Sequence, residues 1–110
     1  MRSYTVSTSK KIVIAESGGF NLSDKARMFI ANVKNLDLKY PNVLRDAADF
    51  AEKNRDADPL LLCLRLLGSS ESSGEGSVLK IVEVPPTIDW EIIVDKNGAE
   101  IVVEKGRYWR

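Results

Sequence analysis

The stretch 78–105, VLKIVEVPPTIDWEIIVDKNGAEIVVEK, decides the fold because it contains three strand-like runs joined by two turn signals. Residues 78–84 are aliphatic and β-branched, and they end at a proline pair that cannot donate to a strand ladder. Residues 87–95 alternate between apolar and polar side chains, as a half-buried strand does. Asn97-Gly98 is then the two-residue signal of a tight hairpin. The sequence therefore predicts three C-terminal strands, the last two forming an Asn-Gly hairpin.

This predicted hairpin has an electrostatic problem. A two-residue turn pairs Val94 with Ile101 and sets Asp95 directly opposite Glu100, and opposed like charges destabilise a sheet. We expect either cations from elsewhere in the chain near these carboxylates, or a bulge that shifts the pairing, or an acidic face that awaits a partner. On an open sheet face such carboxylates are ordinarily solvated. The hairpin carboxylates that would form an acidic stripe are Asp89, Glu91, Asp95, Glu100 and Glu104.

The N-terminal part predicts one strand followed by helices. Residues 10–15 form a β-branched run that ends at a glycine turn. Ser23 is placed to cap a helix over 24–35, whose apolar residues recur at i, i+3, i+4 and i+7. A second helix is expected to carry Pro41 in its first turn, where the missing N–H costs nothing.

The third helix is bounded by two signals. Asp58-Pro59 starts it, with Asp58 as the cap, and Gly68 ends the leucine-rich run 60–67. The Ser/Gly-rich segment 69–77 cannot bury apolar surface, so we expect a mobile loop there.

Together these elements predict an α+β fold. The expected architecture is a small mixed β-sheet, built from one N-terminal and three C-terminal strands, with about three helices packed on one face. A length of 110 residues favours a single domain over 1–110. Residues 1–9 are expected to be flexible or to form an edge strand.

Composition narrows the classes of function. The chain has 16 basic and 16 acidic side chains, so no global field favours nucleic acid or a membrane as partner. It contains no histidine, which excludes histidine-based triads and relays. The single cysteine, Cys63, lies in a leucine stripe, and we expect a core residue rather than a nucleophile. No apolar run approaches the roughly 20 residues of a membrane span, and one cysteine suits a reduced compartment. We expect a cytoplasmic protein with no metal and no cofactor.

One candidate anion site follows the first strand. Gly18 and Gly19 form a turn that leads through Phe20 to the helix N-terminus at Ser23, and exposed N–H groups there can hold phosphate or carboxylate. In this interpretation Arg55 reaches over the turn and grips the ligand with its planar guanidinium. The spacing of a Walker or Rossmann motif is missing. The alternative is a structural turn with Ser23 as helix cap.

The chain end carries a second candidate site. Two aromatics lie between arginines in Arg107-Tyr108-Trp109-Arg110, a composition that suits contact with a partner surface. The alternative is a final strand whose Trp109 packs back on the sheet. We also expect a homodimer built by the C-terminal strand and this tail, because an open sheet edge invites pairing.

The assembled motifs resemble those of a family of short, functionally uncharacterised bacterial and phage proteins. The matching segments are Gly18–Ser23, Asp58-Pro59, Leu79–Pro85, the Trp90 hairpin and Arg107–Trp109. The C-terminal segments are the specific ones, since the family carries a Leu-Lys-Ile-Val-Glu-Ile-Pro strand, a Trp-containing hairpin and an Arg-x-Trp ending. Gly106 stands where a histidine often precedes that arginine. The resemblance implies a phage or prophage setting and a small accessory role.

The sequence favours a non-enzymatic binding protein that acts on a host or phage macromolecule. A protein partner or a second copy of the chain is the expected ligand, since no pair of nucleophile and base can be drawn from these residues. The alternative is a protein that binds or sequesters a nucleotide or another small anion at the glycine turn.

Overall fold

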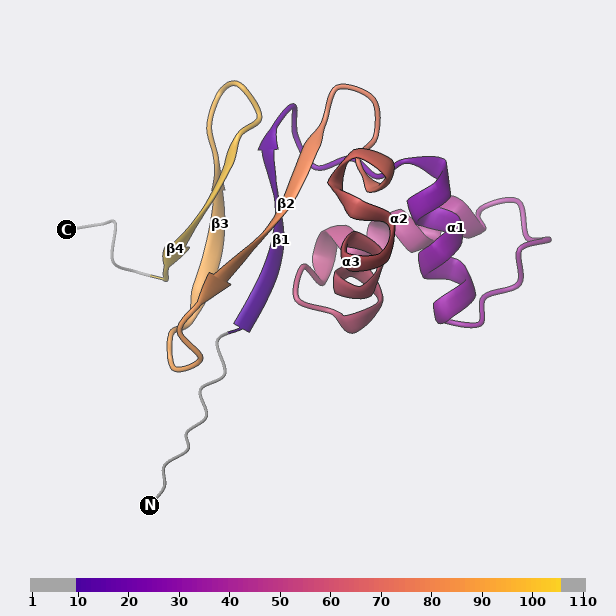
Figure 1. Ribbon diagram of the computed structural model, residues 1–110, viewed down its shortest axis with the longest axis horizontal. Coiled ribbons are helices and arrows are strands. Elements are labelled where there is room, and N and C mark those ends of the chain that lie inside the picture. Colours follow the sequence, from indigo (N-terminus) through magenta and orange to yellow (C-terminus); the bar gives the residue numbers. More distant parts are fainter. Residues whose placement is uncertain (1–9, 106–110) are drawn as a thin grey trace, which may run out of the picture.

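The computed structural model describes residues 10–105. Within this range the elements are β1 (Lys10–Ser17), α1 (Asp24–Val33), α2 (Val43–Lys53), α3 (Asp58–Ser72), β2 (Val78–Val84), β3 (Trp90–Val94) and β4 (Glu100–Glu104). Figure 1 shows the β3–β4 hairpin on one side, the β1–β2 pair in the middle and the helices on the other side. The predicted α+β fold class is confirmed. The predictions for residues 1–9 and for the tail Arg107–Arg110 lie outside the described residues.

The strands form two antiparallel pairs rather than the single mixed sheet that we expected. β1 pairs with β2, and β3 pairs with β4. β4 lies beside β1, but the carboxylate of Glu100 accepts the N–H of Ala15 where a strand carbonyl would do so. A side chain therefore interrupts what would otherwise be a continuous sheet.

The main core lies between the β1–β2 pair and the helices. Val13 and Ala15 of β1 and Leu79 of β2 are all fully buried and pack with the inner faces of the three helices. Ile12 and Ile14 point to the opposite face, because side chains alternate along a strand, and they are equally buried there. Burial on both faces explains why β1 is an apolar run instead of an alternating one.

The helix starts are close to those predicted, with two differences. Ser23 caps α1, and its side chain accepts the N–H of Ala26 at 3.1 Å, as expected. α2 begins at Val43, so Pro41 precedes the helix and is not in its first turn. Ala57 is the N-cap of α3, and Asp58 is its first residue. The carboxylate of Asp58 is thus placed in the first turn, where negative charge is favourable.

The segment 69–77, expected as a loop, begins with a helical turn. Gly68 has a φ of +83°, which interrupts α3 as predicted, but the chain then continues helically to Ser72. The hydroxyl of Ser69 donates to the carbonyl of Leu79, and that of Ser73 accepts the Leu79 N–H at 2.9 Å. The serines order this segment because their hydroxyls satisfy the backbone at the free edge of β2.

The register of the β3–β4 hairpin also differs from the prediction. Val94 pairs with Glu100, one residue away from the expected pairing. The N–H of Asp95 donates to the carbonyl of Ala99, which leaves a three-residue loop that ends in Gly98 at a φ of +83°. This loop is one residue longer than the predicted turn, and its last residue has the positive φ. The added residue shifts the pairing and turns every β4 side chain to the other face. The opposed acids of the predicted register are thereby separated.

Candidate functional site

Arg55, just after α2, and Glu100, at the start of β4, form a buried ion pair. Two nitrogen–oxygen contacts of 2.7 and 3.0 Å join the guanidinium to the carboxylate. The two side chains are only 8% and 5% exposed. The guanidinium carbon of Arg55 also lies 3.8 Å from the ring centroid of Phe20. One aromatic face and one carboxylate therefore enclose this cation.

The same pair covers the free edge of β1. The N–H of Val13 donates to the carbonyl of Arg55 at 3.0 Å, and the Val13 carbonyl accepts from the Arg55 guanidinium at 3.3 Å. The N–H of Ala15 donates to Glu100 at 2.8 Å. Together Arg55 and Glu100 supply the donors and acceptors that a neighbouring strand would supply.

These contacts bear directly on the anion site suggested by the sequence. The structure brings Phe20 and Arg55 together, as that hypothesis requires. The guanidinium, however, already donates hydrogen bonds to the carboxylate of Glu100, to the carbonyl of Val13 and, through Nε, to the carbonyl of Glu52. The geometry thus supports a structural role for Arg55 in the described part of the chain.

The glycine turn is equally engaged in packing. The N–H of Gly19 donates to the carbonyl of Gly98 at 3.0 Å, so the turn is tied to the hairpin loop. A Cβ on Gly18 would lie 1.7 Å from the carbonyl oxygen of Gly76. Ser23 donates its hydroxyl proton to the carbonyl of Glu71 while it caps α1. The geometry therefore supports the structural-turn alternative for these three residues.

A polar hollow of about 240 Å³ lies next to Phe20. Arg27 and Arg45 line it, and so do the acids Asp49 and Glu52. Arg27 donates to the carbonyl of Leu22 and to the side chain of Asn21. The two carboxylates offset the attraction of the two guanidinium groups for an anion, so this hollow has no clear preference for negative charge.

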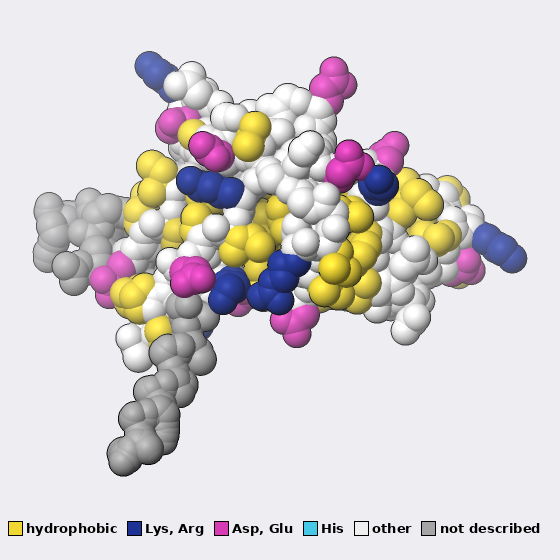
Figure 2. Space-filling view, viewed as in Figure 1, with side chains coloured by type: hydrophobic (Ala, Val, Ile, Leu, Met, Phe, Trp, Pro, Cys, Tyr) yellow, Lys and Arg dark blue, Asp and Glu magenta, His cyan; other side chains and the backbone are white. Residues whose placement is uncertain are grey.

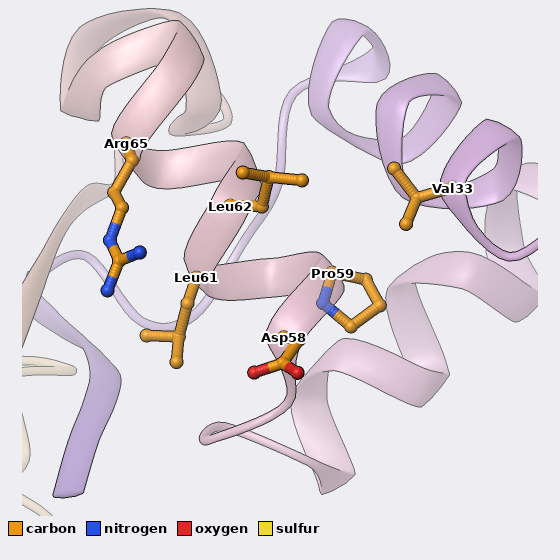
Figure 3. Close-up of a pocket in the computed structure, with 6 residues that line it drawn as sticks. All are labelled: Val33, Asp58, Pro59, Leu61, Leu62 and Arg65. Carbon is orange, nitrogen blue, oxygen red and sulfur yellow. The ribbon is translucent and has the colours of Figure 1, made fainter.

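A second, apolar hollow of about 280 Å³ lies between α1 and α3, and we refer to it as the α1–α3 groove. Its lining residues are Val33, Asp58, Pro59, Leu61, Leu62 and Arg65. In Figure 3, Leu62 and Pro59 of α3 face Val33 of α1 across the gap, with Asp58 and Arg65 at its margins. Leu66, one turn beyond Leu62, is 66% exposed and extends the apolar surface.

The sequence reasoning missed this groove. The i, i+3, i+4, i+7 spacing in the helix over 24–35 includes Val33 and predicts that it faces the core, but Val33 is 41% exposed and lines the groove. The signal was present in α3, which carries two apolar stripes. One, with Leu60 and Leu64, enters the core, and the other, with Leu62 and Leu66, lies outside the core cluster formed within residues 10–105. A helix that is apolar on nearly every side needs more cover than one core provides.

Further apolar exposure lies on the hairpin. Ile93, Val94 and Ile101 are 37%, 56% and 55% exposed. Figure 2 shows apolar side chains at the surface over the hairpin and over the helices, on the face of the molecule that is viewed. Glu100 is not part of the acidic stripe that the sequence predicts, because the register shift turns its side chain to the buried face of β4.

Cys63 is a core residue, as predicted. It is fully buried in α3, and its sulfur lies 3.6 Å from the hydroxyl of Ser72. Burial raises the pKa of the Cys63 thiol, and the contact with Ser72 opposes this rise in part. Among residues 10–105 no three acidic or thiol side chains converge as metal ligands, and none of the helices there is long and apolar enough to cross a bilayer.

Comparison with known proteins gave no match, whether to protein-family models, to curated proteins or to solved structures.

Proposed function

We propose that this protein is a non-enzymatic interaction module that docks an amphipathic helix of a partner protein in the α1–α3 groove. The observation that carries the proposal is the exposed apolar stripe of Leu62 and Leu66 on α3, of which Leu62 lines the groove together with Val33. Large apolar side chains gathered beside a hollow are typical of protein-binding surfaces.

The shape of the groove favours a helix as the ligand. α1 packs against α3, and the furrow between two packed helices suits the ridge of a third. Leu62 and Leu66 are four residues apart, so they stand one above the other on α3 and would interdigitate with apolar residues spaced i and i+4 on the partner.

Charge at the margins supports a particular orientation of that helix. Arg65 lines the groove together with Leu62, and it has no hydrogen bond or ion pair within the described part of the chain. Asp58 lies about two helical turns away, at the start of α3. A partner helix with an acidic residue near Arg65 and a basic residue near Asp58 would complement both ends.

Site-specific photo-crosslinking tests this proposal. A photoreactive residue at Leu66 is used to capture partners from a lysate of the organism that carries the gene. The crosslinked peptide is then sequenced and synthesised. We expect a peptide with an amphipathic helical pattern that binds the isolated protein. Leu62→Ser should weaken its binding at least about tenfold, because a central apolar anchor is lost.

Met28 provides a matched control. It is 45% exposed on α1 and does not line the groove, so Met28→Ser should leave the affinity unchanged. Equal losses for Met28→Ser and Leu62→Ser would contradict the proposal, and so would a crosslinked peptide without helical periodicity. Both variants are compared with the unmodified protein by circular dichroism before binding is measured.

The alternative of a small anionic ligand has less support. Arg55, the residue meant to grip the anion, is bonded to Glu100, and the hollow beside Phe20 carries two acids as well as two arginines. A thermal-shift screen with nucleotides and inorganic phosphate separates the two functions. Ligand at about 100 times its Kd stabilises a protein by roughly 2.7 kcal/mol, so an absence of any shift favours the interaction module.

The biological setting belongs to the same proposal. The resemblance of the C-terminal strand and hairpin to short phage and bacterial proteins supports a phage or prophage gene. The protein would then act in the host cytoplasm on a host or phage protein. A transcript that appears only on prophage induction would support this setting, and constitutive expression outside any prophage region would contradict it.

A further inference from the structure

Among the strands of residues 10–105, β3 has an open edge. In the β3–β4 hairpin the N–H of Lys105 donates to the carbonyl of Asp89, and the N–H of Asp95 donates to that of Ala99. Asp89 and Asp95, on either side of β3, thus direct backbone groups toward β4. Because this direction alternates along an antiparallel strand, the odd-numbered residues of β3 also face β4. Trp90, Ile92 and Val94 therefore direct their N–H and C=O groups away from β4. No hydrogen bond to these groups is found within residues 10–105.

The edges of the other sheet are covered in a way that the β3 edge is not. Arg55 and Glu100 bond to the free edge of β1, and Ser69 and Ser73 bond to β2 at Leu79. Natural proteins cover or charge such edges because an open edge pairs with other strands. β3 has neither proline nor lysine over residues 90–94 to prevent pairing.

We propose that β3 pairs with β3 of a second copy of this chain, antiparallel across a two-fold axis. The two hairpins would then form one four-stranded sheet. A two-fold contact requires a self-complementary surface, and an antiparallel edge strand satisfies this requirement because the backbone pattern repeats in both directions.

The sequence of β3 selects one register. The outward N–H and C=O groups belong to even-numbered residues, so even residues must face even residues. With Ile92 opposite its own copy, Trp90 faces Val94 and Glu91 faces Ile93. The neighbouring registers that keep even residues opposite even residues are less favourable. In one of them Glu91 faces Glu91 of the second copy, and in the other it faces Asp95, so both oppose like charges.

One like-charge pair remains in the chosen register, Asp89 against Asp95. It lies outside the strand bounds of β3, where the two chains are free to diverge. The carboxylate of Asp95 already accepts the N–H groups of Asn97 and Ala99 in its own loop. The contact between Glu91 and Ile93 of the second copy, formed twice by symmetry, therefore becomes the most sensitive probe of the register.

The test is the molar mass of the full chain in solution and its response to charge. Light scattering should give twice the 12.2 kDa chain mass. Ile93→Glu places a carboxylate against Glu91 of the second copy and should raise the dissociation constant at least about tenfold. Ile93→Lys should leave the dimer intact. The double variant Ile93→Glu with Glu91→Lys restores an opposite-charge pair and should recover the dimer.

Ile101→Glu separates edge pairing from face packing. Ile101 lies opposite Ile93 on the same face of the hairpin and is 55% exposed, but it belongs to β4. The dimer should survive Ile101→Glu if β3 pairs through its edge. A monomeric unmodified chain at high protein concentration would overturn the proposal. So would a failure of the charge-swapped double variant to dimerise while its circular dichroism matches the unmodified chain.

Discussion

The guanidinium of Arg55 and the carboxylate of Glu100 meet in a two-pronged ion pair that ties the segment after α2 to the start of β4. The two contacts measure 2.7 and 3.0 Å, and 45 residues separate the partners in the chain. This pair stands in for a strand at the edge of β1 and also holds the hairpin against the rest of the fold. Its position decides which face of β4 turns inward.

Removal of one partner of this pair should destabilise the protein strongly. Glu100→Gln leaves the buried guanidinium of Arg55 without its counter-charge, and such losses cost about 3–5 kcal/mol. Chemical denaturation measures the free energy of unfolding. Glu71→Gln, which removes an exposed partner of Lys25, is the control and should leave that free energy nearly unchanged. A similar small effect for Glu100→Gln would show that the pair contributes little to the fold.

The hairpin loop should be sensitive at Gly98 and tolerant at Asn97. Gly98 has a φ of +83°, and a Cβ there would lie 2.8 Å from the backbone nitrogen of Gly19. Gly98→Ala should therefore cost about 1–2 kcal/mol or more. Asn97 donates only its backbone N–H to Asp95, so Asn97→Ala should be nearly neutral. A two-residue Asn-Gly turn requires positive φ at both positions. Comparable losses of stability for Gly98→Ala and Asn97→Ala would therefore contradict the three-residue loop and favour the two-residue turn.

Cys63 should be unreactive in the folded protein, and its burial should make stability fall in alkali. Because the folded pKa is raised above the ordinary 9.0, the unfolded chain loses the thiol proton first as the pH rises above 9.0. The free energy of unfolding should decrease from there up to the folded pKa. Cys63→Ala should remove this part of the alkaline decrease. Thiol labelling should be slow without denaturant, and fast labelling of the native protein would contradict the buried position.

Glu71 should titrate below its ordinary pKa. The hydrogen bond and charge of Lys25 lower the pKa of this exposed carboxyl from 4.5. Its contribution to stability, which is small because the pair is exposed, is present above pH 4.5 and is lost as the pH falls through the folded pKa. Carboxyl chemical shifts followed by NMR should show the lowered midpoint at low salt, and Lys25→Met or high salt should return it toward 4.5. A midpoint unaffected by Lys25→Met would rule out this cause.

The sequence by itself determined the elements whose signals are local. The Ser23 cap, the apolar spacing after it, the interruption at Gly68 and the strands of 78–104 all depend on residues within a few positions of one another. Local sterics and hydrogen bonds have the same form in any tertiary setting. For this reason the α+β class and the core position of Cys63 were both predictable.

Only the tertiary structure decided the register of the hairpin and the role of Arg55. Asn97-Gly98 is compatible with a two-residue turn, but Gly98 accepts the N–H of Gly19, and Glu100 meets Ala15 and Arg55. These partners lie 45 to 85 residues from Glu100 in the chain. A one-residue shift places Glu100 beside its cation and removes the opposed acids, and these gains outweigh the local preference of the turn. The α1–α3 groove likewise depends on how α1 packs against α3, although the second apolar stripe of α3 is visible in the sequence.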